Sequence, residues 1–484
     1  METRYDPWNS SCRSARSWSR RKRRKRLVHG FDRCLGRPFY YIVVVSMHPN
    51  SMYHATDCRR NLAYQFILAL PRSNTLIPII LPTLYLWIVD TIALRRGTWV
   101  IESETKLEWH LWEGLDAEEA IFFLLTNVLV VFGLIAFDNA YAIVQTFPDI
   151  FSNLPGTPSP IVLIRALAVP PRSYDEQRLH GLKQALGRLR AKSRSFYLAS
   201  GVFQGRLRLD LILLYSFCRV ADDLVDDAST SREASEWIQK LRRVLDLKYA
   251  CTVEKERKSL HDYITSNFPS STHSALLLLP TEYLSPGPLY DLLSGFETDV
   301  KFSTVDDTFP IHENCDLETY GGQVAGTVAE SCLELVYHHS LDNKAIVDKV
   351  ESLRAGRRMG IALQYVNIAR DIAVDAANRR VYLPTSWLKS EGLRPYDVIE
   401  SPEDPKVERL RQKLLDQAMS IYDHSKQAIE DLPQEARGPM RVAVESYVEI
   451  GRMLRNPGYR IKAGRATVPK TRRLRVAWNA LQRG

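Results

Sequence analysis

Two aspartate pairs of identical spacing stand about 150 residues apart in this chain, Asp222 with Asp226 and Asp371 with Asp375. Helical side chains four residues apart lie one turn above each other, so each pair places two carboxylates on one face. Like charges at this spacing repel each other by about 0.2–0.5 kcal/mol, which indicates that a cation is held between them. Oxygen ligands favour Mg²⁺, with Mn²⁺ second, and Mg²⁺ shares its ligands with substrate phosphates. The two pairs therefore predict a metal-dependent site for a diphosphate substrate.

Further polar side chains continue each pair along the same helix face. Tyr215 and Arg219 precede the first pair, and Gln364 and Asn367 precede the second. An isolated Asp-x-x-x-Asp pair is most often a solvated helix face. Apolar residues flank both stripes here, however, and a solvated face would not show this pattern. We therefore expect the two stripes to line a cavity.

Helical periodicity continues almost without interruption beyond residue 175. No alternating pattern of a strand competes with it. Because bundle cores are lined by side chains from facing helices, the sequence predicts an all-α bundle with a central cavity. The expected helices are 177–192, 208–228, 231–249, 287–301, 317–341, 343–377, 404–431 and 436–456.

Five segments, in the same order, resemble those of the squalene and phytoene synthases, the head-to-head prenyl synthases. Two of them are the aspartate helices. Ser193–Tyr197 resembles the family's Ser-x-Ser-Phe flap, and Tyr320–Val328 resembles its Tyr-x-x-x-Val-Ala-Gly helix. Arg379–Pro384 resembles the Gly-Arg-x-Tyr-Leu-Pro sequence that closes the second aspartate helix, although Ala329 and Asn378 stand where the family often has glycine. The resemblance implies an isoprenoid synthase-type helical bundle.

The resemblance also implies how the site residues act. Head-to-head coupling begins when an allylic diphosphate ionises, which requires Mg²⁺ and cationic side chains around the departing diphosphate. Asp223 and Asp227 lie off the main stripe and are weaker candidates. The predicted metal ligands are Asp222, Asp226, Asn367, Asp371 and Asp375, and the predicted catalytic residues are the same four aspartates with Tyr215 and Arg219.

Substrate binding is predicted on the same basis. Arg219, Arg370 and Arg380 would hold diphosphate oxygens, because arginine suits bidentate phosphate contacts, and Tyr382 would add a hydrogen bond. For each arginine, an ion pair with a neighbouring acid is an equally good interpretation. The apolar side chains that would exclude water from the carbocation are Phe196, Val324, Ala325 and Leu363, although core packing explains them as readily. The predicted substrate-binding residues are Ser193, Ser195, Phe196, Tyr320, Val324, Ala325, Gln364, Asn367, Arg370, Arg380 and Tyr382.

The implied reaction is the condensation of two geranylgeranyl diphosphates, through the cyclopropyl compound prephytoene diphosphate, to phytoene in carotenoid biosynthesis. No Gly-rich dinucleotide loop follows a predicted strand, so we expect no NADPH. Squalene synthases need that reductant and phytoene synthases do not. Two alternatives stay open: a squalene or dehydrosqualene synthase that uses farnesyl diphosphate, and a non-catalytic membrane assembly factor of the same fold. The intact acids of both pairs argue against the second.

Two apolar stretches precede the synthase-like part. Residues 76–94 contain two prolines and one aspartate, and residues 120–144 exceed the roughly 20 residues that a bilayer requires. Buried helices of a soluble core are the alternative. Trp99, Trp109 and Trp112 lie between the stretches, where an interfacial aromatic belt would place them. We therefore expect a membrane protein whose synthase domain faces the cytosol.

Thr98–Ser103 and Glu118–Asn127 resemble the membrane-embedded lycopene cyclase module that fungi fuse in front of phytoene synthase. That module carries six or seven helices in two related halves, and residues 65–150 resemble only the second half. Glu118 and Glu119 resemble one of its two acidic motifs, or they are acids that favour a helix N-terminus. We expect this part to anchor the protein without closing lycopene rings, and lycopene β-cyclase activity stays open.

Composition bounds the remaining functions. The net charge of +9 includes seven basic residues in the run 20–26, which lacks the interleaved aromatics of a nucleic-acid-binding segment. We expect a disordered tail there, with lipid contact second. Seven scattered cysteines show no disulfide or metal spacing, which indicates a reducing compartment. Contact with other carotenoid enzymes stays open. The expected parts are a disordered basic segment 1–60, a membrane segment 61–150, a Pro/Ser-rich linker 151–170 and a synthase domain 171–484.

Overall fold

A computed structural model describes residues 72–98, 109–152, 158–251, 254–340, 349–456 and 468–482. The chain forms two compact units, residues 1–175 and 176–484. The predicted disordered segment 1–60, with its basic run, and most of the cyclase-like segment Thr98–Ser103 lie outside the described residues. The four cysteines that the structure describes are all free thiols.

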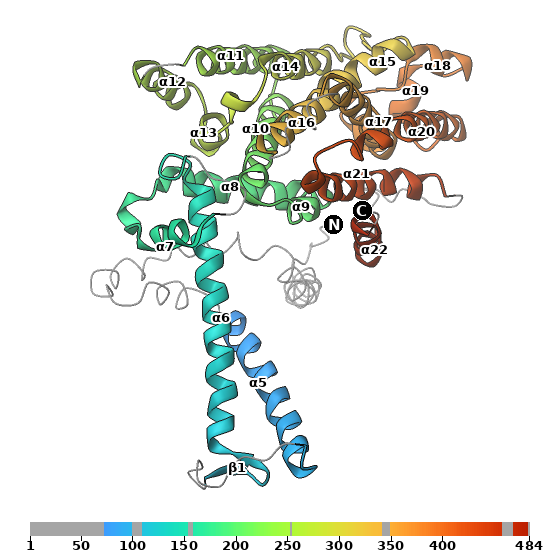
Figure 1. Cartoon of the computed structure of the whole chain (residues 1–484). Helices are drawn as coiled ribbons and strands as arrows, with labels where there is room; N and C mark the ends of the chain where they lie inside the picture. Colours follow the sequence, from blue (N-terminus) through green and yellow to red (C-terminus); the bar gives the residue numbers. More distant parts are fainter. Residues whose placement is uncertain are drawn as a thin grey trace, which may run out of the picture. The chain divides into compact units, whose positions relative to one another are not determined.

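The first unit is built around two long helices, α5 and α6 (Figure 1). Both predicted apolar stretches are helical, and α5 continues through Pro78 and Pro82. A short antiparallel hairpin follows α5 and leads directly into α6. The segment predicted to be a linker contains a helix, α7, whose first turn is capped by the Ser159 side chain. The elements are α5 (Arg72–Arg95), β1 (His110–Trp112), β2 (Leu115–Asp116), α6 (Ala117–Thr146), α7 (Pro160–Ala168) and η2 (Pro171–Ser173).

The surfaces of α5 and α6 are largely apolar and exposed. Polar contacts join the two helices: Asn127 Nδ2 donates to Thr83 Oγ1 at 3.1 Å, and Trp87 Nε1 donates to the Ala120 carbonyl at 3.0 Å. Both helices are long and apolar enough to cross a membrane. A core helix of a soluble protein would bury most of its apolar side chains, whereas only 28% and 11% of the apolar windows of these two helices are buried. Large exposed side chains include Leu76, Ile80, Leu84 and Ile88 on α5 and Phe122, Leu125, Leu129 and Leu134 on α6.

The second unit is a helical bundle, which confirms the all-α prediction. Its described residues contain no strand, only one isolated bridge between Ser303 and Thr308. The elements are α8 (Glu176–Lys192), α9 (Arg194–Ser200), α10 (Gly205–Asp226), α11 (Ser231–Ala250), α12 (Glu254–Asn267), α13 (Ser270–Leu277), η3 (Thr281–Tyr283), α14 (Pro286–Val300), α15 (Asn314–Gly321), η4 (Gly322–Gly326), α16 (Thr327–His339), α17 (Lys349–Ala377), α18 (Thr385–Ser390), α19 (Pro395–Glu400), α20 (Pro405–Ser425), η6 (Lys426–Ile429), α21 (Gln434–Leu454) and α22 (Lys470–Leu481).

All eight predicted helices of this unit are present, and their described ends differ from the predicted ones by a few residues at most. Residues 341–348, which belong to the predicted helices 317–341 and 343–377, lie outside the described residues. The predicted helix 317–341 is three elements, because the π-helical turn η4 separates α15 from α16. Such π-turns are rare and frequently occur at functional sites. Sequence periodicity did not find the short helices α9, α13, α18 and α19 or the highly charged helices α12 and α22.

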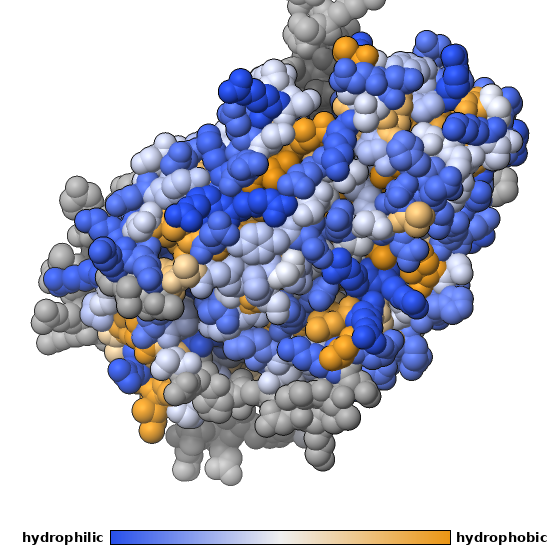
Figure 2. Space-filling model, turned by 90° about the horizontal axis from the view of Figure 1, so that it is seen from above, coloured by the Kyte–Doolittle hydropathy of each residue, from blue (hydrophilic) through white to orange (hydrophobic). Residues whose placement is uncertain are grey.

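Helix α17 lies at the centre of the unit and packs against α16, α20, α21 and η4. Its approach to η4 depends on Gly360, since a Cβ atom there would lie 2.5 Å from the Ala325 carbonyl oxygen. Tyr365 of α17 belongs to one large apolar cluster, and Phe217 of α10 belongs to a second. The face shown in Figure 2 is mainly hydrophilic with small apolar patches, as expected for a surface in water.

Candidate active site

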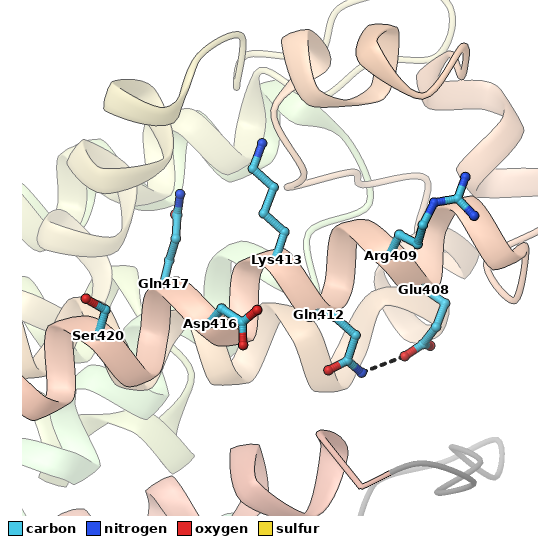
Figure 3. A pocket seen from close by; sticks show the side chains of 7 residues that line it. All are labelled: Glu408, Arg409, Gln412, Lys413, Asp416, Gln417 and Ser420. Carbon is cyan, nitrogen blue, oxygen red and sulfur yellow. Dashed lines mark hydrogen bonds between the residues drawn. The ribbon is translucent and has the colours of Figure 1, made fainter.

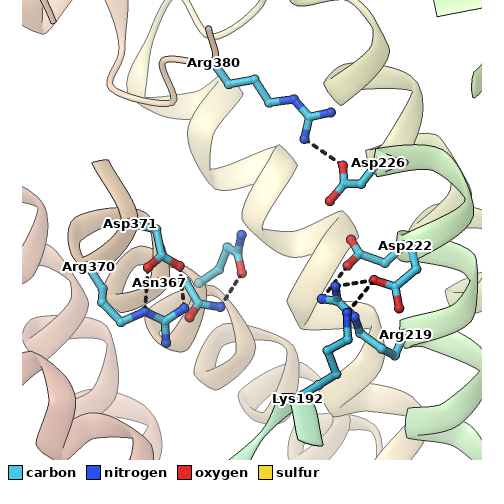
Figure 4. Close-up of polar contacts among 10 residues, drawn as sticks. Lys192, Arg219, Asp222, Asp226, Asn367, Arg370, Asp371 and Arg380 are labelled. Atoms are coloured by element: carbon cyan, nitrogen blue, oxygen red, sulfur yellow. Dashed lines mark hydrogen bonds and ion pairs between the residues drawn. The ribbon is translucent and has the colours of Figure 1, made fainter. Parts of the chain in front are cut away.

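Helix α10 presents the first predicted stripe. Arg219 Nη1 lies 2.8 Å from Asp222 Oδ2, and the same guanidinium contacts Asp223. Lys192 Nζ lies 3.1 Å from Asp223 Oδ1 (Figure 4). Asp223 is thus part of this charged group, although the sequence ranked it as a weaker candidate. Asp227 is the exposed residue that caps α10.

Helix α17 presents the second stripe. Arg370 binds Asp371 with two nitrogens, and its Nε donates to Asp371 Oδ1 at 2.8 Å. Asn367 Nδ2 donates to Gln364 Oε1 at 3.2 Å, and the Tyr447 hydroxyl donates to Asn367 Oδ1. Tyr447 belongs to α21 and was not predicted, because no motif around it indicates a role.

Arg380, just beyond α17, connects the two stripes. Its Nη1 lies 2.8 Å from Asp226 Oδ1 on α10. Figure 4 shows the labelled side chains of α10 and α17 directed toward each other, with Arg380 reaching across to α10. The structure therefore brings both predicted aspartate pairs to one site, as the sequence pattern required.

A buried carboxylate that the sequence analysis missed completes this site. Asp299 of α14 is 8% exposed. Its Oδ1 accepts hydrogen bonds from the Tyr320 hydroxyl at 2.9 Å and from the Tyr382 hydroxyl at 2.7 Å. The two tyrosine rings stack with centroids 5.1 Å apart. Asp299 follows Leu292 and Phe296 on the buried face of its helix. An acidic residue on an otherwise apolar helix face is the sequence pattern that could have indicated this site residue.

Three carboxyl groups of the site have pKa values above the ordinary value of an aspartate. Burial, together with the charge of Asp226, raises the pKa of Asp222 to about 7. Burial, together with the charge of Asp371, raises the pKa of Asp375 to about 8. Burial also raises the pKa of Asp299 to about 6, although an arginine and two tyrosine hydroxyls act in the opposite direction. A bound cation would relieve this repulsion.

The donor set fits Mg²⁺, the ion that the sequence resemblance implies. Among the described residues, no group of three acidic, histidine or cysteine side chains already has a metal-binding arrangement, and arginines contact three of the four aspartates predicted to bind the metal. Mg²⁺ needs no such cage, because it takes one or two carboxylates and fills its other positions with water and substrate phosphate. The residues that would hold it are Asp222, Asp226, Asp371 and Asp375, with the Asn367 amide oxygen in addition.

An aromatic group lies beside the charged residues. Phe196 of α9 stacks on Tyr447 with centroids 5.3 Å apart and meets Tyr215 edge-on at 6.3 Å. Ser193 caps α9, since its hydroxyl accepts from the Phe196 amide at 3.3 Å. The predicted residue Ser195 is buried on the same helix. These contacts fix the predicted flap segment against α10 and α21.

The predicted wall residues Val324 and Ala325 lie in the π-turn η4. Val324 packs against the large apolar cluster that contains Tyr320 and Tyr382. It also approaches Gly295 of α14 closely, since a Cβ atom there would lie 2.5 Å from Val324 Cγ1. The π-turn thus lies between α14, which carries Asp299, and α17, which carries the second aspartate pair.

A hollow of about 540 Å³ on the outer face of α20 has a different character (Figure 3). Every residue that lines it is polar or charged, so it could not shelter a hydrocarbon cation from water. It is therefore not the active site. The lining residues are Glu408, Arg409, Gln412, Lys413, Asp416, Gln417 and Ser420.

Comparison with known proteins decides which family this site belongs to. Residues 189–472 match the family model described as squalene/phytoene synthase. The chain belongs to the squalene/phytoene synthase family. The matched segment begins before the flap and contains all five motifs, the two aspartate helices, Asp299 and Tyr447.

Curated members of this family that resemble the chain are fungal bifunctional enzymes. The bifunctional lycopene cyclase/phytoene synthase of Gibberella fujikuroi is 56% identical over 423 residues, which are 87% of this chain and 73% of the relative. The Leptosphaeria maculans protein is 56% identical over 421 residues, with 87% and 72% covered. The Neurospora crassa protein is 50% identical over 436 residues, with 87% and 72% covered. These alignments extend beyond the family-model segment, and the second unit corresponds to their phytoene synthase part.

One solved structure that the chain resembles is a dehydrosqualene synthase in complex with a ligand, which is 21% identical. The superposition has a TM-score of 0.49 and covers 63% of this chain and 96% of that structure. Family membership and the identity of the curated relatives confirm the predicted squalene/phytoene-type prenyltransferase and its place among the bifunctional lycopene cyclase/phytoene synthases. The roles of individual site residues stay predictions.

Proposed function

We propose that the second unit joins two molecules of geranylgeranyl diphosphate head to head, through prephytoene diphosphate, to give phytoene. Mg²⁺, or Mn²⁺ in its place, would assist the reaction, and no NADPH would be consumed. The observation that carries the proposal is the convergence of both aspartate stripes and Arg380 at one site. The curated relatives named as phytoene synthases support the C20 substrate.

The first step is cleavage of an allylic C–O bond, in which the diphosphate leaves with the bonding electrons. Arg219, Arg370 and Arg380 carry the fixed positive charge nearest to the carboxylates. Their guanidinium groups can exchange a carboxylate for a phosphate oxygen and retain two parallel hydrogen bonds. Bound Mg²⁺ would add positive charge on the departing oxygens. The ionisation of the diphosphate thus relies on side chains from both α10 and α17.

The second requirement is an environment without water for the allylic cation. Phe196, Tyr215 and Tyr447 present aromatic rings on one side of the charged group. Val324 adds an aliphatic side chain from the π-turn. Aromatic faces also stabilise a nearby cation through their negative quadrupole. These groups can hold a prenyl chain and exclude water while the allylic cation adds to the C=C bond of the second substrate and a proton is lost, which closes the cyclopropane ring of prephytoene diphosphate.

Asp299 fixes the two tyrosines that complete the site. Each hydroxyl donates to the same carboxylate oxygen, so the stacked rings of Tyr320 and Tyr382 have a defined orientation. A preorganised hydrogen-bond network stabilises a developing charge without reorganisation during the reaction. Asp299 is therefore assigned as a positioning residue.

A product assay with the purified full chain tests the proposal. Geranylgeranyl and farnesyl diphosphate are supplied separately in detergent micelles with Mg²⁺, each with and without NADPH. We expect phytoene from the C20 substrate in the absence of NADPH. Consumption of the C15 substrate alone, or product only with NADPH, would show a squalene-type synthase. No turnover of either substrate by protein that binds both would indicate the non-catalytic alternative.

The first unit is proposed to anchor the protein in a membrane. Its two apolar helices expose large side chains along most of their length, and a bilayer would cover that surface. A membrane location suits a synthase whose substrate tails and product are hydrocarbons. The synthase domain is proposed to face the cytosol.

A further inference from the structure

The last described helix, α22, exposes an apolar stripe next to basic side chains. Leu474, Trp478 and Leu481 follow each other at intervals of four and three residues, so they share one face of the helix. Trp478 is 63% exposed, Leu481 41% and Leu474 37%. Single exposed apolar residues need no explanation, but three in one helical row form a surface.

Basic residues border this stripe. Helix α22 contains one lysine and three arginines and no acidic residue. Lys470 lies one turn before Leu474, and the exposed Arg475 directly follows Leu474. A helix with Trp and Leu on one face and Lys or Arg beside them is typical of helices that lie in the interface of an anionic bilayer.

Contacts with α21 hold α22 in place and leave the stripe exposed at the side of the bundle. Ala477 and Ala480 are buried in a cluster with Val442 of α21 and Ala199 of α9. Arg441 Nε donates to the Ala480 carbonyl at 3.0 Å. Near the other end of the helix, Arg472 forms an ion pair with the buried Glu449. The apolar stripe is therefore exposed beside the packed face of a helix that these contacts hold in place.

We propose that α22 binds the surface of an anionic lipid bilayer as a second membrane contact, in the catalytic unit itself. This inference rests on the proposed function, because it deepens the membrane role that the first unit suggests. The complementary charge selects anionic lipid as the occupant, since the negative surface of such a bilayer attracts Lys and Arg side chains. Anchorage by α5 and α6 would raise the local lipid concentration, so even a weak interfacial helix would bind.

The location of α22 connects this contact to catalysis. Its buried side packs against α9, which carries Phe196, and α21, which carries Tyr447. These two aromatic residues stack on each other beside the charged site. Binding of α22 would therefore place the α9–α21 wall of the site next to the bilayer, where prenyl chains dissolve. Substrate and product could exchange with lipid on this side without crossing water.

The test separates α22 from the apolar helices of the first unit. A protease recognition sequence is inserted between Asp175 and Glu176, at the boundary of the two units. The full chain is reconstituted in vesicles of phosphatidylcholine with or without phosphatidylserine and then cleaved. Flotation of the vesicles shows whether the second unit stays on the lipid. We expect retention on phosphatidylserine vesicles and its loss when about 0.5 M NaCl screens the charges.

Two variants make the assignment specific. Leu474→Glu with Trp478→Glu should lower retention at least about tenfold, since it removes apolar contact and adds repelled charges. Val305→Glu with Val350→Glu makes the same charge change at exposed apolar positions of the same unit and should leave retention unchanged. Release of the cleaved wild-type unit from anionic vesicles would overturn the proposal. Equal retention of the Leu474/Trp478 variant would also overturn it, because another surface would then hold the unit.

A second copy of the chain is the other occupant that the stripe could have. Release of the wild-type unit as a dimer that the double variant does not form would show that occupant and overturn the bilayer proposal. Phytoene synthesis by the cleaved second unit of the wild type and of each variant is measured in parallel in detergent micelles. Retention does not depend on turnover, so inactive protein that stays on anionic vesicles would contradict the proposed function and leave the α22 inference supported.

Discussion

Arg380 Nη1 lies 2.8 Å from Asp226 Oδ1, and this ion pair joins two residues that are 154 positions apart in the sequence. Burial disfavours the charged guanidinium, but Tyr382, Asp226 and Asp299 together raise the pKa of Arg380, so the residue stays cationic. The ion pair closes the end of the site at which α10 terminates and the segment after α17 begins. Arg380 is therefore a cation that can exchange the Asp226 carboxylate for an oxygen of a substrate diphosphate.

Replacement of Arg380 tests this role. Arg380→Gln should lower kcat by about a hundredfold or more, because it removes a donor and a charge from the departing diphosphate. Arg380→Lys keeps the charge without the bidentate geometry and should lose less activity. Steady-state kinetics with geranylgeranyl diphosphate measures both. Equal activity of the Gln variant and the wild type would exclude Arg380 from diphosphate binding.

The aspartate pairs can be compared with a nearby acid that lies outside the predicted metal site. Asp222→Asn and Asp371→Asn should each lower turnover at least about a hundredfold with the fold intact, because each removes a charge that holds Mg²⁺. Asp227→Asn, at the exposed end of the same α10, should stay near wild type. Turnover is measured at saturating Mg²⁺. A small loss that extra Mg²⁺ restores would indicate that the other carboxylates replace the missing ligand.

Asp299 should matter for stability as well as for turnover. Asp299→Ala leaves the buried hydroxyls of Tyr320 and Tyr382 without their acceptor, and each unsatisfied group costs about 1–3 kcal/mol. Asp299→Asn keeps an acceptor oxygen and should destabilise the protein less. Thermal unfolding measures the difference. Addition of Tyr320→Phe to Asp299→Ala should recover part of the loss, because it removes one of the orphaned hydroxyls, and no recovery would argue against this network.

The comparison of sequence and structure shows what periodicity can determine. Spacing placed Asp222 with Asp226 and Asp371 with Asp375, because residues of one helix share a face whatever surrounds the helix. It could not predict that Asp299, on a third helix, meets both tyrosines, since that contact depends on how helices pack. The family resemblance supplied Tyr320 and Tyr382, but no resemblance pointed to Tyr447.

Helix α22 was missed for a different reason. Its sequence contains one lysine and three arginines among twelve residues, and it attaches to the bundle through two alanines, Ala477 and Ala480, that give almost no hydrophobic signal. The helix α7 likewise lies in a segment whose prolines predicted a linker. Local composition therefore showed where these segments are charged and where they contain prolines, but it did not predict that they form helices. Their helical structure depends on packing against the rest of the chain.

The raised carboxyl pKa values predict an unusual pH dependence of stability. Asp222, Asp375 and Asp299 bind protons more tightly in the folded chain, with pKa values of about 7, 8 and 6, than in the unfolded chain. Stability in chelator should therefore be highest at acidic pH within this range and should fall as pH rises from about 4 to 8. Added Mg²⁺ requires ionised ligands, so the stabilisation that it provides should increase with pH. Thermal unfolding with chelator and with Mg²⁺ tests both trends, and stability in chelator that rises over this range would contradict the first.

Membrane anchorage by the first unit is the remaining prediction. Leu125 and Leu129 are exposed in the apolar middle of α6, and a lysine near the centre of a membrane helix costs about 2.5–3.5 kcal/mol. The wild-type chain should therefore stay in the membrane pellet after an alkaline carbonate wash, whereas Leu125→Lys with Leu129→Lys should be extracted or aggregate. Val305→Lys with Val350→Lys adds the same charge to exposed apolar positions of the second unit and should fractionate like the wild type. Extraction of the wild-type chain under these conditions would show that α5 and α6 do not span a bilayer.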